Sequence, residues 1–166
     1  MDSIVTEQDQ LLDGSTVEIV RADPSTEDAR WCFEQYFKEL GERFEGGFNP
    51  ALSISAQPDE LRPPAGLLLL AYLHGEPVGC GALKLHETVG EVKRMWVSPN
   101  ARGLGMGKRM LLALEKAARE FGISILHLET NRALTEAISL YKKSGYQEVD
   151  PFNSETYAHH WFEKHL

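Results

Sequence analysis

Apolar residues recur along this chain with two periods, and the change of period divides it into strands and helices. In residues 16–21, Val17 and Ile19 alternate with polar positions, which is the period of a half-buried strand. Residues 67–73 are an almost unbroken apolar run and favour a buried strand. Turn residues then separate three predicted antiparallel strands, over residues 67–73, 78–85 and 91–97.

Three other segments repeat their apolar residues at helical spacing. The first follows Asp23 and carries a stripe typical of a core-facing helix, formed by Ala29, Cys32, Phe33, Tyr36, Phe37, Leu40 and Phe44. The second follows a glycine-rich loop and ends at Gly122, and the third covers residues 135–144 and ends at Gly145. Shorter strands are predicted over residues 123–129, 146–149 and 156–164.

The remaining segments set the limits of the fold. Residues 1–14 predict a flexible N-terminal tail, and residues 15–166 predict a single domain. Residues 45–64 are polar and broken by glycine and proline, so we expect a long loop or short helical turn of the kind that is often functional. The alternation of strands and helices predicts a mixed α/β layer structure.

Composition narrows the class of protein. The chain has 166 residues, of which 42% are hydrophobic, and this is enough for one buried core. The net charge of -8 argues against a nucleic-acid binder and is compatible with a cationic or amine substrate. The two cysteines, Cys32 and Cys80, match neither a disulfide framework nor a zinc site, and no metal is expected. With no signal peptide or membrane-length apolar run, we expect a cytoplasmic protein that uses no membrane.

A loop with three glycines in five positions joins a predicted strand to a predicted helix at residues 98–108. Glycines let the backbone approach a ligand closely, and the N–H groups at a helix start attract an anion. The spacing lacks the third glycine of a dinucleotide fingerprint, and it lacks the Gly-Lys-Ser/Thr of a nucleotide P-loop. What remains is R-x-x-G-x-G, formed by Arg102, Gly105 and Gly107, beside the alternative of a turn without a ligand.

Three segments together resemble the GNAT superfamily of N-acetyltransferases, in particular its bacterial single-domain members. They are the R-x-x-G-x-G loop, the strand of residues 91–97 that leads into it, and the stretch A-x-x-L-Y-x-x-x-G-Y at residues 137–146. The resemblance implies a GNAT fold of class α/β (α+β), with a mixed, mostly antiparallel sheet of six to seven strands flanked by about four helices. It also implies acetyl-CoA as cosubstrate, with the loop amides around its diphosphate.

The cofactor residues implied by the resemblance lie on the strand, the loop and the last helix. They are Met95, Trp96, Val97, Arg102, Gly103, Leu104, Gly105, Met106, Gly107, Lys108, Asn131, Ala137 and Tyr141. One position departs from the family. Many members have asparagine three residues before the helix alanine, where this chain has Leu134, so Asn131 is the nearest amide that can serve.

Amide formation requires a neutral amine and a leaving thiol. An amine with a pKa near 10.4 is about one part in a thousand neutral at pH 7, which costs about 4.6 kcal/mol, so a proton acceptor is valuable. The resemblance gives this role to Glu91, directly or through water, against the alternative of a solvated glutamate at a strand edge. Tyr141 is the candidate proton donor to the leaving thiolate, against a purely packing role. Backbone N–H groups of residues 95–97 are the candidate oxyanion donors, provided that the strand bulges.

The acceptor side is the least defined. The region where the first helix meets the long loop contains Arg43, Phe44, Phe48 and Asn49, which are candidate acceptor residues. Arg43 and Arg94 are a candidate pair for binding a substrate carboxylate. Three acidic residues of the same region are instead candidates for attracting a polyamine or a protein lysine, namely Glu39, Glu42 and Glu45.

Three functions therefore compete. We expect an N-acetyltransferase that acts by direct attack of a small, amino-acid-like primary amine. The alternatives are a protein or peptide N-acetyltransferase, with an open groove at residues 45–64, and a CoA-binding regulatory module without turnover. The terminal strand is a candidate edge for a homodimer.

Overall fold

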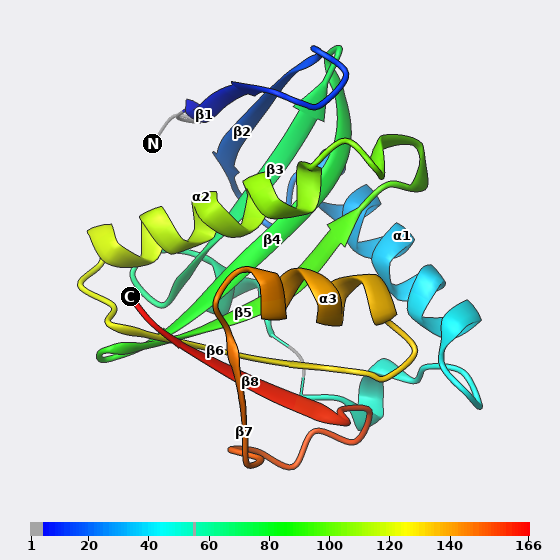
Figure 1. The fold of residues 1–166 in the computed structure, drawn as a ribbon, viewed down its shortest axis with the longest axis vertical. Helices are drawn as coiled ribbons and strands as arrows, with labels where there is room; N and C mark the ends of the chain where they lie inside the picture. Colours follow the sequence, from blue (N-terminus) through cyan, green and yellow to red (C-terminus); the bar gives the residue numbers. More distant parts are fainter. Residues whose placement is uncertain (1–4, 55) are drawn as a thin grey trace.

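One sheet of eight strands runs through the computed structural model, which describes residues 5–54 and 56–166 (Figure 1). The strand order is β1-β2-β3-β4-β5-β6-β8-β7, and all neighbours are antiparallel except β5 and β6, which are parallel. The strands are β1 Val5–Gln10, β2 Thr16–Ala22, β3 Gly66–Leu73, β4 Glu76–His86, β5 Val89–Val97, β6 Ile125–Thr130, β7 Gln147–Val149 and β8 His160–His165.

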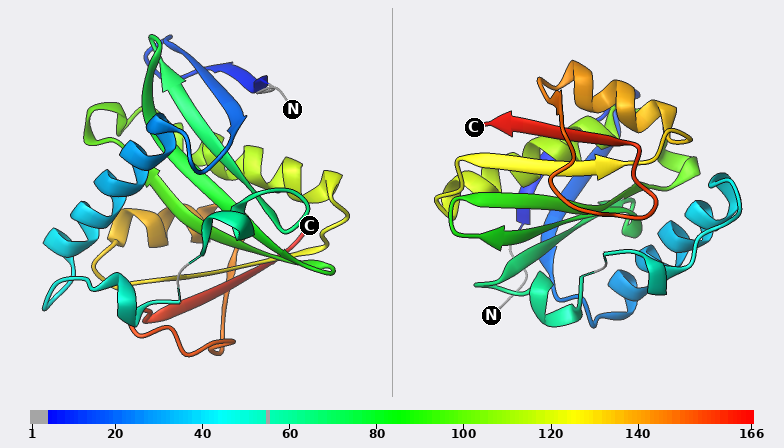
Figure 2. Two further views of the ribbon diagram at one scale, coloured as in Figure 1. Left: turned by 180° about the vertical axis from the view of Figure 1, so that it is seen from behind. Right: turned by 90° about the horizontal axis from the view of Figure 1, so that it is seen from below.

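Helices cover both faces of the sheet. Helix α1, Glu27–Arg43, lies on one face, while α2, Met106–Glu120, and α3, Thr135–Lys143, lie on the other (Figures 1 and 2). The hydroxyl of Thr26 caps α1 by accepting a hydrogen bond from the N–H of Ala29. Three short 3-10 helices complete the fold, at Pro50–Leu52, Pro58–Leu61 and Pro99–Ala101. No helix of the described residues is long and apolar enough to cross a membrane.

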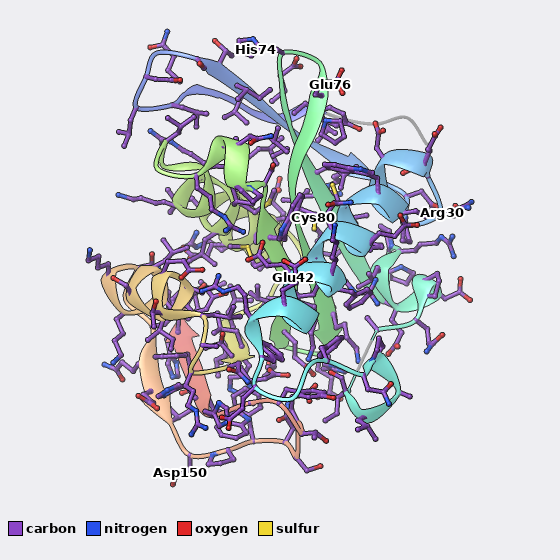
Figure 3. All side chains as sticks on the ribbon, turned by 90° about the vertical axis from the view of Figure 1, so that its right-hand side faces the viewer. Arg30, Glu42, His74, Glu76, Cys80 and Asp150 are labelled. Carbon is purple, nitrogen blue, oxygen red and sulfur yellow. The ribbon has the colours of Figure 1, made fainter. Side chains whose placement is uncertain are left out.

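The core lies on both sides of the central strands. In β3, Leu67 and Leu69 belong to the cluster beneath α2, while Leu68 and Leu70 belong to the cluster beneath α1. All four are at most 1% exposed. This explains why the strand is apolar at every position rather than at alternate ones. The labelled Cys80 lies near the centre of the molecule, whereas His74 and Glu76 flank the β3–β4 turn at one end (Figure 3).

The predicted GNAT-type fold is confirmed, with four differences. The described residues form eight strands and three α-helices, where six to seven strands and about four helices were expected. The extra strand is β1, because residues 5–10 of the predicted tail pair with β2. The last strand begins at His160 rather than 156. It is also internal, paired with β6 and β7, so it is not the expected dimer edge.

A bulge in β5 opens the sheet next to its parallel neighbour. Between the pairs Ala82–Lys93 and Cys80–Trp96, β5 has one more residue than β4, and Arg94 takes a φ of 53°. Strands β5 and β6 pair only from Val89 to Glu91. Beyond Glu91 the two strands are no longer paired, and this leaves an opening between them.

Candidate active site

The glycine-rich loop presents a row of N–H groups at the start of α2. Gly103 and Gly105 have φ values of 80° and 86°, and Gly105 is the N-cap residue of the helix. Within the described part of the chain, the N–H groups of residues 103–108 donate no hydrogen bond. Six successive free donors at a helix N-terminus are suited to hold an anion.

A cavity of about 390 Å³ lies beside this loop. Eleven of the thirteen predicted cofactor residues line it: Met95, Trp96, Val97, Arg102, Gly103, Gly105, Met106, Gly107, Lys108, Ala137 and Tyr141. Leu104 does not line it, because its side chain packs against the core. The carbonyl of Leu104 accepts a hydrogen bond from the N–H of Leu12, at 3.0 Å.

The loop is tied to β5 and α1 by side chains at the cavity wall. The Nε of Arg102 donates to the carbonyl of Val97 at 2.9 Å, and its guanidinium forms an ion pair with Glu39. Trp96 donates from Nε1 to the same carboxylate at 3.2 Å. Glu39 therefore holds the side chains of Arg102 and Trp96 at the cavity wall, a role that the sequence indicates only as a charge on α1.

A second cavity of about 120 Å³ continues from the first. The two share six lining residues: Tyr36, Leu40, Met95, Leu134, Ala137 and Tyr141. Their junction lies at the β5 bulge, since Met95 lines both. One cavity can thus hold a cofactor that reaches the junction, and the other an acceptor that enters from the opposite side.

Two tyrosines stand at the junction. Tyr141 is 6% exposed, and burial raises the pKa of its hydroxyl well above the ordinary value, with the charge of Glu129 adding to the effect. Burial raises the pKa of Tyr36 in the same way. Both groups therefore stay protonated and can donate. The sequence predicts Tyr36 as a core residue of the first helix, whereas the structure places it beside both cavities. Helical spacing of apolar residues does not distinguish a helix face that is packed in the core from one that borders a cavity.

Glu91, the predicted base, lies outside both cavities. Its carboxylate contacts His86 Nε2 at 2.9 Å and Lys93 Nζ at 3.3 Å, and its side chain is 21% exposed. Glu91 occupies the part of β5 that is still paired with β6, before the strands separate. Two other acidic residues line the second cavity, Glu129 of β6 and Glu155, and neither was predicted from the sequence.

The two arginines predicted to hold a substrate carboxylate are separated. Arg94 lines the second cavity, where its guanidinium stacks 4.4 Å from the Phe33 ring centroid and donates to the carbonyl of Ala56 at 2.8 Å. Burial lowers the pKa of Arg94. Arg43 lines the first cavity instead. The structure therefore does not assemble the expected carboxylate clamp.

Arg43 joins α1 to α3. It donates to Glu136 from both terminal nitrogens and to the carbonyl of Ala133 at 2.9 Å. The hydrogen bonds from Arg43 lower the pKa of Glu136 from 4.5 to about 2. The ion pair thus contributes stability that is complete above pH 4.5 and is lost as the pH falls toward 2.

We therefore expect Glu136→Gln to be less stable than the wild type at pH 6, by about 0.2–1 kcal/mol, because the Glu136 side chain is 55% exposed and solvent weakens the pair. The gap in Tm between the two proteins should narrow as the pH is lowered from 4.5. Thermal unfolding at a series of pH values measures it. A gap that stays constant down to pH 3 would show that the pair does not stabilise the fold.

Asn131 is engaged by the chain itself. Its Nδ2 donates to the carbonyl of Tyr157 at 2.8 Å, and its Oδ1 accepts from the N–H of Ala133 at 2.8 Å. It lines the second cavity and not the cofactor cavity. Asn131 thus shapes the loop after β6, and the expected cofactor contact is not supported.

Two loops close the second cavity. The rings of Phe44, Phe48 and Tyr157 contact one another, with centroid distances of 4.9–5.8 Å. Asn49 donates from its N–H to the Tyr157 hydroxyl at 2.8 Å. Glu155 accepts from the Ile54 N–H at 2.8 Å and from the Ser53 hydroxyl. Phe44 and Phe48, the predicted acceptor residues, thus line the second cavity. The sequence contains no pattern that predicts Tyr157 and Glu155 as site residues, because they belong to a loop that is distant in the chain.

Neither cysteine is a candidate nucleophile. Cys32 and Cys80 are both 0% exposed. A hydrogen bond with Cys32, together with burial, raises the pKa of the Cys80 thiol well above its ordinary value. The reactive thiolate is therefore disfavoured, and the site offers direct transfer rather than a covalent acyl-enzyme.

Comparison with known proteins agrees with this geometry. The acetyltransferase (GNAT) family profile matches residues 30–146. An IAA acetyltransferase of Azospirillum brasilense is 36% identical over 138 residues, which are 82% of this chain and 88% of that protein. A Klebsiella pneumoniae protein assigned as an acyl-CoA N-acyltransferase has a similar crystal structure, with a TM-score of 0.73 and 29% identity over 90% of this chain and 97% of that one.

A third relative was solved with the coenzyme. The PaiA N-acetyltransferase of Thermoplasma acidophilum, in complex with coenzyme A, has a TM-score of 0.55 and 26% identity, covering 61% of this chain and 62% of that one. The family match covers most of the sequence, and the Azospirillum relative aligns over nearly its full length. The chain therefore belongs to the acetyltransferase (GNAT) family, whose members use acetyl-CoA, and it is an N-acetyltransferase.

Proposed function

We propose that this protein transfers an acetyl group from acetyl-CoA directly to the primary amine of a small molecule. The observation that carries the proposal is the meeting of two cavities at Tyr141, one of them bordered by the free N–H groups of residues 103–108. A phosphate-bearing cofactor and an acceptor can approach this junction from opposite sides.

The cofactor is held by backbone and charge. The diphosphate of acetyl-CoA accepts hydrogen bonds from the loop N–H groups, and the positive end of α2 and the ammonium of Lys108 favour its negative charge. The acyl arm enters the opening between β5 and β6, where strand pairing ends at Glu91. The N–H groups of the β5 bulge, at Met95 to Val97, are the donors for the developing oxyanion.

Tyr141 supplies the proton for the leaving group. Its hydroxyl stays protonated because burial raises its pKa, and it lines both cavities. Attack of a neutral amine on the thioester carbonyl breaks the C–S bond, and protonation of the thiolate by Tyr141 prevents the reverse attack. Transfer is direct, since both cysteines are buried in the core.

The covered acceptor cavity favours a small molecule over a protein. Residues 49–54 are hydrogen-bonded to residues 155–157, where a peptide acetyltransferase requires an open groove. The separation of Arg43 from Arg94 removes the reason to expect a carboxylate on the acceptor. We therefore propose a small primary amine, without the amino-acid character that the sequence alone suggested.

Two measurements test this function. Isothermal titration should show that acetyl-CoA and CoA bind, and no binding at millimolar ligand would contradict the proposal. A panel of primary amines, followed by release of the free CoA thiol, should then give turnover. Binding without turnover of any amine would instead favour a CoA-binding regulatory module.

A further inference from the structure

A buried carboxylate at the acceptor cavity lacks part of its hydrogen bonding. The Glu129 side chain is 8% exposed, and its Oε1 accepts from Lys93 Nζ at 2.8 Å. Its Oε2 has almost no exposed surface and no hydrogen-bond partner, the only buried side-chain nitrogen or oxygen of which this is true among the described side chains of residues 10–54 and 56–166. An unpaired charged acceptor is costly inside a protein, so its retention requires an explanation.

Elsewhere in the fold a comparable carboxylate is fully paired. Glu115 of α2 is 2% exposed. Its two oxygens accept from Lys164 Nζ at 3.1 Å, and Oε2 also accepts from the Tyr146 hydroxyl at 2.8 Å. Glu115 lines neither cavity of the site. The fold can therefore satisfy a buried glutamate completely, and Glu129 differs because it borders the acceptor space.

The charged side chains around Glu129 leave one negative charge without a compensating cation. Lys93 bridges Glu129 and Glu91, and although burial alone would lower its pKa, the two carboxylates outweigh this and raise it. This group of three side chains carries a net charge of -1. The other charged side chains of the cavity are already occupied: Arg94 by the Phe33 ring and the Ala56 carbonyl, and Glu155 by the segment 53–54.

We propose that Glu129 binds the ammonium group of the acceptor and takes its proton. This inference rests on the proposed function and names its substrate class: a primary ammonium on a flat apolar body. Rotation of the carboxylate toward the cavity lets the ammonium supply the missing donor to Oε2 and neutralise the group of three, while Phe44, Phe48 and Tyr157 cover the apolar part. Glu129 replaces Glu91 as the base, and Lys93 becomes a positioning residue that fixes the carboxylate through Oε1.

The reaction then balances as follows. The ammonium gives one proton to Glu129, and the neutral nitrogen attacks the thioester carbonyl carbon. The C–S bond breaks, and the CoA sulfur takes the hydroxyl proton of Tyr141. The second proton lost by the nitrogen restores that hydroxyl, and Glu129 releases its proton to solvent. The products are the amide, CoA and one proton.

The test uses two ligands that differ only in charge, phenethylamine and 2-phenylethanol, titrated calorimetrically into protein saturated with CoA. The wild type should bind the amine at least about 10-fold more tightly than the alcohol, and Glu129→Gln should lose this preference, a difference of about 1.4 kcal/mol. The control Glu115→Gln removes an equally buried charge and should keep the preference, although its Tm falls.

A preference retained in Glu129→Gln, or equal or absent binding of the two ligands by the wild type, would overturn the assignment. If Glu129→Gln fails to bind CoA, the carboxyl ¹³C shift of Glu129 in the wild type serves instead: it should move with phenethylamine only, and no movement would overturn the assignment. Binding of the amine through Glu129 without thiol release from any amine would refute the proposed function and leave the site intact.

Discussion

Gly105→Glu is expected to abolish acetyl-CoA binding, with a Kd weakened by at least about 100-fold, or 2.7 kcal/mol. Gly105 is the N-cap of α2 and has a φ of 86°, which a side chain adopts only with strain. The new carboxylate would also stand among the loop N–H groups, where it competes with the diphosphate and repels it. Isothermal titration with acetyl-CoA measures the loss.

Gly75→Glu is the matched control. Gly75 has a φ of 79° and no atom within 4 Å of an added Cβ, so the substitution brings a similar strain and the same charge to the β3–β4 turn. We expect it to lower Tm but to retain acetyl-CoA affinity within about twofold. If Gly75→Glu and Gly105→Glu lost affinity equally, general destabilisation would be the cause and the loop would not be the anion site.

Tyr141→Phe is expected to lower kcat by about 100-fold while leaving the Kd of acetyl-CoA unchanged. The phenylalanine keeps the packing against Tyr146 and Phe162, with ring centroids near 6 Å, but removes the proton donor at the junction. A general acid typically raises a reaction rate by about 10²–10⁴-fold. Because a thiolate can also leave without protonation, we expect a loss of kcat at the lower end of this range. Steady-state assays of thiol release and titration with acetyl-CoA separate the two effects.

A neighbouring tyrosine provides the comparison. The hydroxyl of Tyr146 donates to Glu115 and lines neither cavity. Tyr146→Phe removes a buried hydrogen bond, so we expect a lower Tm with kcat unchanged within about twofold. Unchanged turnover in Tyr141→Phe would remove that residue from the mechanism.

The elements with a strong apolar pattern were predictable, and those held by backbone pairing were not. The apolar run at 67–73 and the apolar stripe of α2 are buried because their side chains are hydrophobic, so the sequence pattern alone predicts that they lie in the core. Strand β1 has the sequence Val-Thr-Glu-Gln-Asp-Gln, with a single apolar residue. It is held in the sheet by pairing with β2, and no periodicity records that pairing.

The same distinction separates the two halves of the site. The cofactor side could be predicted because it is formed by one continuous loop. The spacing of the glycines and the start of the helix both lie within a few residues of sequence. The acceptor side assembles Phe44, Glu129 and Tyr157 from segments more than 25 residues apart. Arg43 and Arg94 were paired on charge alone, yet a sequence does not show which carboxylate or carbonyl an arginine will meet first.

The contact between Leu12 and Leu104 gives the N-terminal hairpin a part in the coenzyme site. Leu12 donates its N–H to the loop carbonyl, and its Cγ lies 3.7 Å from where a side chain would begin at Gly105. Leu12 is itself 82% exposed, so the core gains little from it. Through Leu12, the hairpin instead supports the glycine-rich loop. We therefore expect a substitution of Leu12 to change coenzyme affinity more than it changes the stability of the fold.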